Sequence, residues 1–240
     1  LFSIAFHGVT QAQMPLQLWY DRPAKIWEEA LPLGNGFTGA MVFGQVSRER
    51  IQLNNGTLWS GSRQEGNNPT GPAQLANLRK AIFEGHYADA AASWKSNFQG
   101  PYSARFLTMA DLFLDFEFAD STVSSYRRSL DLQTAIHEVR YQVADVTYTR
   151  ETFISYPNKV MAIRLSTDKK EALTFTTELS SKLKHQVATL GDNYMLLKGK
   201  APKYVAHRAT DEQQVVYDDA LPGEGMTFEV HVQLKVDGGS

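Results

Sequence analysis

Apolar and polar residues alternate one by one along much of the second half of the chain. The clearest run is 226–236, in which every second residue is apolar, and residues 112–118 and 135–148 show the same pattern. Successive side chains of a strand point to opposite faces, so this pattern predicts sheets with one buried face and one wetter face. Further strands are predicted at 149–156, 160–166, 173–179 and 194–197.

The stretch 30–61, ALPLGNGFTGAMVFGQVSRERIQLNNGTLWSG, combines two strand-like runs with turn signals at both ends. An apolar run at 40–46 is followed by a charged break at 47–50 and a second run at 51–54. Asn55-Gly56 then supplies a second turn. This order predicts a β-hairpin with special loops at its ends.

Gly34, Gly36 and Gly39 of this stretch also match the spacing of a dinucleotide-binding loop. That site needs a strand before the glycines and a helix after them, so that the pyrophosphate lies at a helix N-terminus. Here Pro32 precedes the glycines and a β-rich segment follows. We therefore interpret the glycines as residues that permit positive φ in a tight loop, and we predict no cofactor.

Residues 72–98 are the one region with a helical period. Leu75, Leu78 and Ile82 recur at spacings of three and four residues, which is typical of one helix face. Gly85 is predicted to end the first helix, and the Ala-rich run 88–98 predicts a second one. The whole pattern predicts a mainly β protein, a large β-sandwich of two stacked sheets, with a short αα-hairpin insertion outside the sheets.

Composition excludes several classes of function. The 240 residues carry a formal net charge of −2 with a pI near 6.3, so nucleic-acid binding, which needs a strongly basic face, is not predicted. The chain contains no Cys, which rules out disulfides, thiolate metal sites and a cysteine nucleophile. The six histidines show neither His-x-His nor His-x-x-x-His spacing, so no metal site is predicted.

Residues 1–13, LFSIAFHGVTQAQ, do not have the composition of a folded domain. The apolar run at 1–6 is far shorter than the roughly 18 residues that a membrane helix needs, so no membrane span is predicted. Thr10-Gln11-Ala12 places small residues where a signal peptidase reads them. We expect residues 1–13 to be the remainder of a signal peptide, residues 14–240 to be the domain, and the protein to be secreted or periplasmic. The alternative is an edge strand.

Acid–base catalysis on a glycosidic bond needs two groups that flank the bond. The candidate carboxylate pairs are Asp111 with Asp115, Glu28 with Glu29, and Asp218 with Asp219. The first pair would lie about 13 Å apart along one face of a strand, beyond the roughly 6.5–9.5 Å of an inverting glycosidase. Adjacent carboxylates on a strand point to opposite faces. No pair in this chain is therefore predicted to be catalytic.

Five sequence segments carry a resemblance to a known family. ALPLGNGFTGAMVFG and IQLNNGTLWSG are similar to the N-terminal domain of glycoside hydrolase family 95, and so are YRRSLDL at 126–132, YTRETF at 148–153 and GMTFE at 225–229. The resemblance covers roughly residues 18 to 237. One departure is visible, because relatives usually carry a Glu-Asp pair where this chain has Asn55-Gly56.

This resemblance implies an α-L-fucosidase-like exo-glycosidase, with some relatives acting on α-L-galactosides. It implies a β-sandwich of the supersandwich type that precedes an (α/α)6 catalytic barrel, in which a Glu acid and Asn-activated water perform an inverting reaction. No position here matches that catalytic motif, so no catalytic residue is assigned. The partners it implies are the chain's own C-terminal barrel and fucosylated or galactosylated glycans, and the domain alone is expected to be inactive.

Asn54 and Trp59 lie in the part of the domain whose loops the resemblance turns toward the barrel, and Asn35 lies in the first turn of the same stretch. We predict them as substrate or interdomain contacts, with simple packing as the alternative. A free-standing carbohydrate-binding module is a second hypothesis, since aromatic faces stack on sugar rings and Trp19, Trp27, Trp59 and Trp94 are available. A third is a structural domain that docks a partner, which predicts a large exposed apolar patch.

Overall fold

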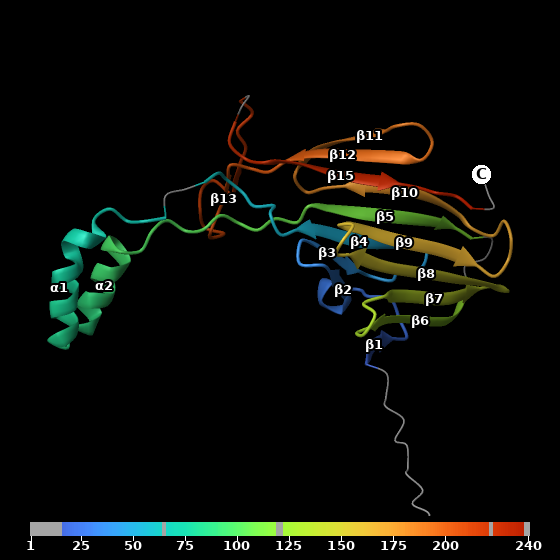
Figure 1. The fold of residues 1–240 in the computed structure, drawn as a ribbon, viewed down its shortest axis with the longest axis horizontal. Helices are drawn as coiled ribbons and strands as arrows, with labels where there is room; N and C mark the ends of the chain where they lie inside the picture. The colour runs from blue at the N-terminus through green and yellow to red at the C-terminus, as the bar shows by residue number, and fades with distance from the viewer. Residues whose placement is uncertain (1–15, 64–65, 119–121, 221–222, 238–240) are drawn as a thin grey trace, which may run out of the picture.

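The fold is mainly β, as predicted, and its sheets are antiparallel. The computed structural model describes residues 16–63, 66–118, 122–220 and 223–237, and Figure 1 shows their arrangement. Within these ranges the chain forms fifteen strands, two α-helices and one 3-10 turn, η1 (Trp27–Glu29). The predicted signal-peptide remainder at 1–13 lies outside the described residues.

Two five-stranded sheets form the sandwich. Sheet 1 has the order β1 (Gln17–Tyr20), β6 (Val123–Asp131), β7 (His137–Val143), β8 (Val146–Ser155), β9 (Val160–Thr167). Sheet 2 has the order β10 (Thr174–Ser180), β5 (Ala110–Glu117), β4 (Arg48–Asn55), β3 (Thr38–Val42), β2 (Leu31–Gly34). Sheet 3 contains β11 (Lys184–Thr189), β12 (Tyr194–Lys200) and β15 (Thr227–Gln233), and β13 (Tyr204–Val205) pairs with β14 (Val215–Val216).

The main core fills the space between these sheets. Sheet 2 contributes its whole inner face, from Leu31 of β2 to Leu179 of β10. Leu130 of β6 and the partly buried side chains of β9 come from sheet 1, and Leu197 and Val230 come from sheet 3. The one-by-one alternation of β5 and β7 therefore reflects real burial, as the sequence predicted.

Two predicted boundaries are wrong. The last strand ends at Gln233, although the alternating pattern runs to Val236, and both Met226 and Val236 are exposed outside it. The break between the two hairpin strands lies at 43–47, so the charged residues 48–50 belong to β4. Two of these charges are paired with the neighbouring strand β5 of the same sheet, Arg48 with Asp115 and Arg50 with Asp111. A local reading of the sequence cannot detect such partners.

A buried ion pair joins sheet 2 to sheet 1. Glu49 of β4 and Arg150 of β8 are 2% and 4% exposed, with Arg150 Nη1 lying 3.1 Å from Glu49 Oε2. Glu49 Oε1 accepts hydrogen bonds from the backbone N–H of Gly44 (2.8 Å) and of Arg50 (3.1 Å). Arg150 Nη2 donates to the carbonyl of Gln45 at 2.6 Å. The turn between β3 and β4 is therefore wrapped around the charged pair.

The predicted αα-hairpin is present as α1 (Gly71–Phe83) and α2 (Tyr87–Asn97). Gly85 adopts a φ of +78° just after α1, as expected for a helix-ending glycine. Figure 1 shows the two helices packed on each other and standing clear of the sheets. Of the predicted helix face only Leu78 is buried, while Leu75 and Ile82 are exposed.

Arg150→Met should destabilise the chain by about 3–5 kcal/mol, because the substitution leaves the Glu49 carboxylate buried without its counter-ion. The double variant with Glu49→Gln should lose less than the sum of the two single changes. Urea unfolding of the four proteins measures this cycle. Arg48→Met, which breaks an exposed ion pair, is the control and should lose much less. Additive losses in the cycle would contradict the coupling.

His137 should make stability depend on pH. The ring is fully enclosed, neither ring nitrogen has a hydrogen-bond partner among the described residues, and burial beside Arg150 and Arg128 lowers the pKa of His137 to about 3. At pH 5 the folded ring stays neutral, whereas the unfolded ring, with a pKa near 6.5, takes up a proton. Stability is therefore lost as pH falls below 6.5, by about 2 kcal/mol between pH 7.5 and 5.

The measurement is urea unfolding of the parent chain and of His137→Leu at pH 7.5, 6 and 5. The variant should lack this share of the pH dependence. Equal loss of stability in the two proteins over this range would show that His137 is not buried in its neutral form.

Candidate functional site at the loop end of the sandwich

Asn35 holds the turn between β2 and β3. Its Oδ1 accepts hydrogen bonds from the backbone N–H of Phe37 (3.0 Å) and of Thr38 (2.8 Å). Its Nδ2 donates to the carbonyl of Ser155 at 2.9 Å, which ties the turn to the end of β8 in the other sheet. The amide is thus fully engaged within the protein.

Asn54 lies on the outward side of β4, opposite Gly39 of β3. A Cβ on Gly39 would come within 2.6 Å of Asn54 Oδ1, so the glycine makes room for this amide. No hydrogen bond joins the Asn54 side chain to another described residue. Of the three predicted contact residues, Asn54 is therefore the one whose amide remains available to a ligand or partner.

Trp59 follows the turn that leaves β4. Its Nε1 donates to the carbonyl of Gly56 at 2.9 Å, and its ring meets Phe106 edge to face with centroids 5.4 Å apart. The backbone N–H of Gly56 in turn donates to the carbonyl of Phe37 at 2.7 Å. These bonds bring the turns of Asn35 and Trp59 to the end of sheet 2 at which Asn54 of β4 lies.

Four exposed aromatic side chains gather at this end: Phe37, Trp59, Phe106 and Tyr156. We call them the aromatic rim. Phe37 and Tyr156 have ring centroids 6.4 Å apart, and Lys159 Nζ lies 5.4 Å from the Phe37 ring. The sequence predicted only Trp59 of these four as a contact residue. Phe106 and Tyr156 come from distant parts of the chain, so a local pattern could not place them beside it.

The amides of Asn35 and Asn54 and the ammonium group of Lys159 lie beside the aromatic rim, and none of these residues is a carboxylate. Of the candidate pair in η1, Glu29 accepts the backbone N–H of Lys25 at 2.8 Å and Glu28 is exposed to solvent. Most of the other candidate carboxylates are bonded elsewhere. Asp111 pairs with Arg50 at 2.8 Å and Asp115 with Arg48 at 2.5 Å. Asp218 accepts backbone hydrogen bonds from Ala220 and Glu224, which lower its pKa. The rim is therefore suited to contact and packing rather than to acid–base catalysis.

A glycosidase's general acid needs a raised pKa and access to the leaving oxygen. Burial raises the pKa of Glu49, against the opposing effects of Arg150 and of backbone N–H groups. Glu49 is nevertheless enclosed between the sheets and ion-paired, so a glycosidic bond cannot reach it. The raised pKa of Glu49 therefore results from its burial in the core and does not indicate a reaction site.

The described residues contain no cluster of three or more His, Asp or Glu side chains arranged to hold a metal ion. His231 contacts the Tyr194 hydroxyl and Glu229. Both ring nitrogens of His137 are without a hydrogen-bond partner among the described residues.

The four tryptophans do not form one platform. Trp19 lies under Arg127 on β1, and Trp27 donates to Gln52 on the outer face of sheet 2. Trp59 belongs to the rim and Trp94 to α2. Figure 1 shows α2 well away from β1 and the rest of the sandwich. This arrangement does not favour a carbohydrate-binding module in which the four tryptophans form one sugar-binding surface.

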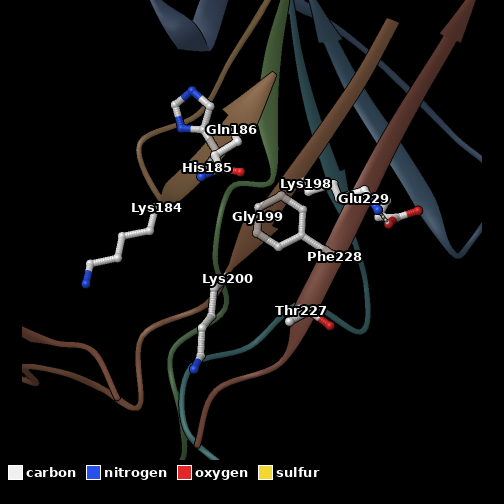
Figure 2. Close-up of a pocket in the computed structure, with 9 residues that line it drawn as sticks. All are labelled: Lys184, His185, Gln186, Lys198, Gly199, Lys200, Thr227, Phe228 and Glu229. Atoms are coloured by element: carbon white, nitrogen blue, oxygen red, sulfur yellow. Dashed lines mark ion pairs between the residues drawn. The ribbon is translucent and has the colours of Figure 1, made fainter. Parts of the chain in front are cut away.

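An open groove of about 770 Å³ lies along sheet 3 and is drawn in Figure 2. The ring of Phe228 occupies its centre above Gly199, where a Cβ would come within 2.2 Å of the ring. The lysines beside it are engaged, with Lys184 bound to Asp219 and Lys198 to Glu229. The groove is thus a glycine–aromatic contact between neighbouring strands and offers little free charge to a ligand.

The part of the chain that the structure describes contains no helix long and apolar enough to cross a membrane.

Asn35→Ala should cost about 1–3 kcal/mol of stability, since two backbone donors and the Ser155 carbonyl lose their partner. Asn35→Asp should lose less, because it keeps the two acceptor bonds. Asn54→Ala, at the same end, should be nearly neutral in stability. Urea unfolding of the three variants provides the test, and equal losses for Asn35→Ala and Asn54→Ala would contradict these roles.

Known proteins are similar to this chain over nearly all of its length. A family model described as "Glycosyl hydrolase family 65, N-terminal domain" matches residues 18–240. Alpha-L-fucosidase 2 of Arabidopsis thaliana is 32% identical over 232 residues, a match that covers 94% of this chain and 27% of the relative. Probable alpha-fucosidase A of Aspergillus niger is 29% identical over 234 residues, covering 93% and 27%.

A second Aspergillus protein, probable alpha-fucosidase A of Aspergillus oryzae, is 31% identical over 175 residues, which cover 68% of this chain and 23% of the relative. The chain therefore spans about a quarter of the length of the curated relatives it matches, 27% in the first two. The expectation of a glycosidase N-terminal domain is confirmed. The chain belongs to the glycosyl hydrolase family 65 N-terminal domain family, in the form found in alpha-fucosidase-like glycoside hydrolases.

Proposed function

We propose that this chain is the non-catalytic N-terminal domain of an α-L-fucosidase-like exo-glycosidase, and that it supports a catalytic (α/α)6 barrel that follows it. The observation that carries the proposal is the pair of coverages, since the match takes in 94% of this chain and 27% of the fucosidase relative. A domain of this size leaves most of such a protein to perform the reaction.

The distribution of carboxylates supports the same division of labour. Asp111 and Asp115 are ion-paired, Asp218 and Glu29 accept backbone N–H groups, and Glu49 is enclosed. An inverting glycosidase needs an acid and a base on opposite sides of a sugar ring with a water between them. We assign both groups to the downstream barrel.

The aromatic rim and Asn54 are the contacts that this domain offers to that barrel or to the edge of its cleft. Rings and a free amide on short, well-anchored loops suit a docking surface, because little side-chain freedom is lost when they bind. In this proposal the substrates are fucosylated or galactosylated glycans, and the protein is secreted or periplasmic.

The full-length protein should hydrolyse 4-nitrophenyl α-L-fucoside or α-L-galactoside, and residues 1–240 alone should not. The reason is that none of the candidate carboxylate pairs among the described residues is placed to act as acid and base on the two sides of one glycosidic bond. Release of 4-nitrophenol by both proteins, measured side by side at equal concentration, makes the comparison and also identifies the preferred sugar.

Turnover by residues 1–240 alone would overturn the assignment of the reaction to the barrel. Binding of fucose by the isolated domain without hydrolysis would favour a carbohydrate-binding module instead. Quenching of tryptophan fluorescence by added sugar reports such binding.

A further inference from the structure

The αα-hairpin of α1 and α2 exposes nearly all of its own surface. Among its residues only Gly71, Leu78 and Ala90 are buried. Helices shorter than about 12–15 residues are marginal in water when they stand alone, and α1 and α2 contain 13 and 11 residues. A hairpin with so few buried contacts lacks the tertiary packing that usually stabilises helices of this length.

The exposed apolar residues of the hairpin share one face. Leu75, Ile82 and Phe83 of α1 follow the helical period on one side of the contact with α2, with the exposed Arg79 between them. Antiparallel pairing brings Tyr87 and Trp94 of α2 to the same side, because they lie in the same rotational sense from that contact. Phe98, the residue after α2, stacks on Trp94 with ring centroids 5.4 Å apart. Phe83, Tyr87 and Trp94 are 87%, 70% and 55% exposed. We call this surface the apolar face of the hairpin.

The opposite face is polar. It carries Gln74, Asn77, Asp89, Ser93 and Ser96, and Asn77 Nδ2 donates to Gln74 Oε1 at 3.1 Å on this side. A hairpin that is apolar on one side and polar on the other is built to lie against a second surface. Large apolar side chains exposed together on one side of a surface element mark an interaction site.

The base of the hairpin is closed by specific bonds. Asn68 Nδ2 donates to the carbonyls of Ser96 (3.1 Å) and Gln99 (3.3 Å), and Thr70 Oγ1 donates to the carbonyl of Asn97 at 3.2 Å. A Cβ at Gly100 would meet the Gly66 carbonyl oxygen at 2.0 Å, so the two chain segments pass in close contact.

A ribbon of residues 58–61 and 104–107 then connects the hairpin to the sandwich. Ser60 and Arg105 exchange two bonds of 2.9 Å, and the backbone N–H of Leu107 donates to the Leu58 carbonyl at 3.1 Å. The backbone N–H of Gly61 donates to the Pro202 carbonyl at 2.8 Å, which braces the ribbon from a third segment. The hairpin is therefore presented on an ordered support, which reduces the entropy lost on docking.

We propose that the apolar face of the hairpin docks onto the polypeptide that follows this domain in the full-length protein, and so acts as an arm that holds the two parts together. This proposal rests on the proposed function. The relatives suggest which surface covers the apolar face. The matched family is an N-terminal domain, and about three quarters of the fucosidase relative lies outside the match. The occupant is thus a complementary apolar surface on the same chain.

Hydrogen exchange of the full-length protein tests the arm. Amides of residues 71–98 should exchange at least about a hundredfold more slowly than in an unstructured peptide, because a docked arm opens only with the interface. Trp94→Asp and Phe83→Asp should each speed this exchange about tenfold or more. Ser96→Asp and Asn77→Asp put the same charge on the polar face of the same helices and should leave the exchange unchanged.

Two exchange results would overturn the arm. One is exchange of residues 71–98 in the parent protein at rates close to those of an unstructured peptide. The other is an equal increase in exchange rate for the apolar-face and polar-face variants, which would show that Trp94 and Phe83 stabilise the helices but do not dock. Protection that rises with protein concentration, together with a dimer in sedimentation, would instead assign the face to a second copy.

The same samples are assayed for release of 4-nitrophenol, which separates the two proposals. An active enzyme with an unprotected hairpin would overturn the arm and leave the proposed function standing. A protected hairpin in a protein without glycosidase activity would overturn the proposed function and leave the docking.

Discussion

The structure depends on one buried ion pair between its two main sheets. Glu49 and Arg150 are removed from water, so each charge needs the other and also needs hydrogen bonds to the backbone. Those bonds come from Gly44, Gln45 and Arg50, which are the residues that lead from β3 into β4. The pair therefore fixes where β4 begins and how sheet 2 is placed over sheet 1.

The register of β4 is set at this point, and the loop end follows from it. Once Glu49 is inside, Ile51 and Leu53 must also face the core, and Asn54 must face outward beside Gly39. The turns that leave β4 then meet Phe37 and Phe106 and form the aromatic rim. A surface of contact residues is thus positioned by a charge that lies at the far end of the same strand.

Sequence patterns predicted the elements that depend on local rules. The alternation in β5 and β7, the αα-hairpin and the glycine after α1 all appear as expected, because burial and helix ends are encoded within a few residues. Charged residues in β4 were misread as a loop, since their partners are supplied by β5 and β8. The rim was only partly predicted for the same reason, as Phe106 and Tyr156 reach it from distant parts of the chain.

The rim and the arm belong to one end of the molecule, because the bridge between Trp59 and Phe106 is also the root of the ribbon that carries the hairpin. A partner that covers the rim is therefore brought toward the hairpin as well, and the two contacts act on the same body. Two separated contacts fix the orientation of a partner far better than one, since rotation about the first is stopped by the second. In the proposed arrangement the 28 residues 71–98 form helices outside the sandwich because their apolar face packs against the partner. That contact is the second point of attachment, beside the aromatic rim.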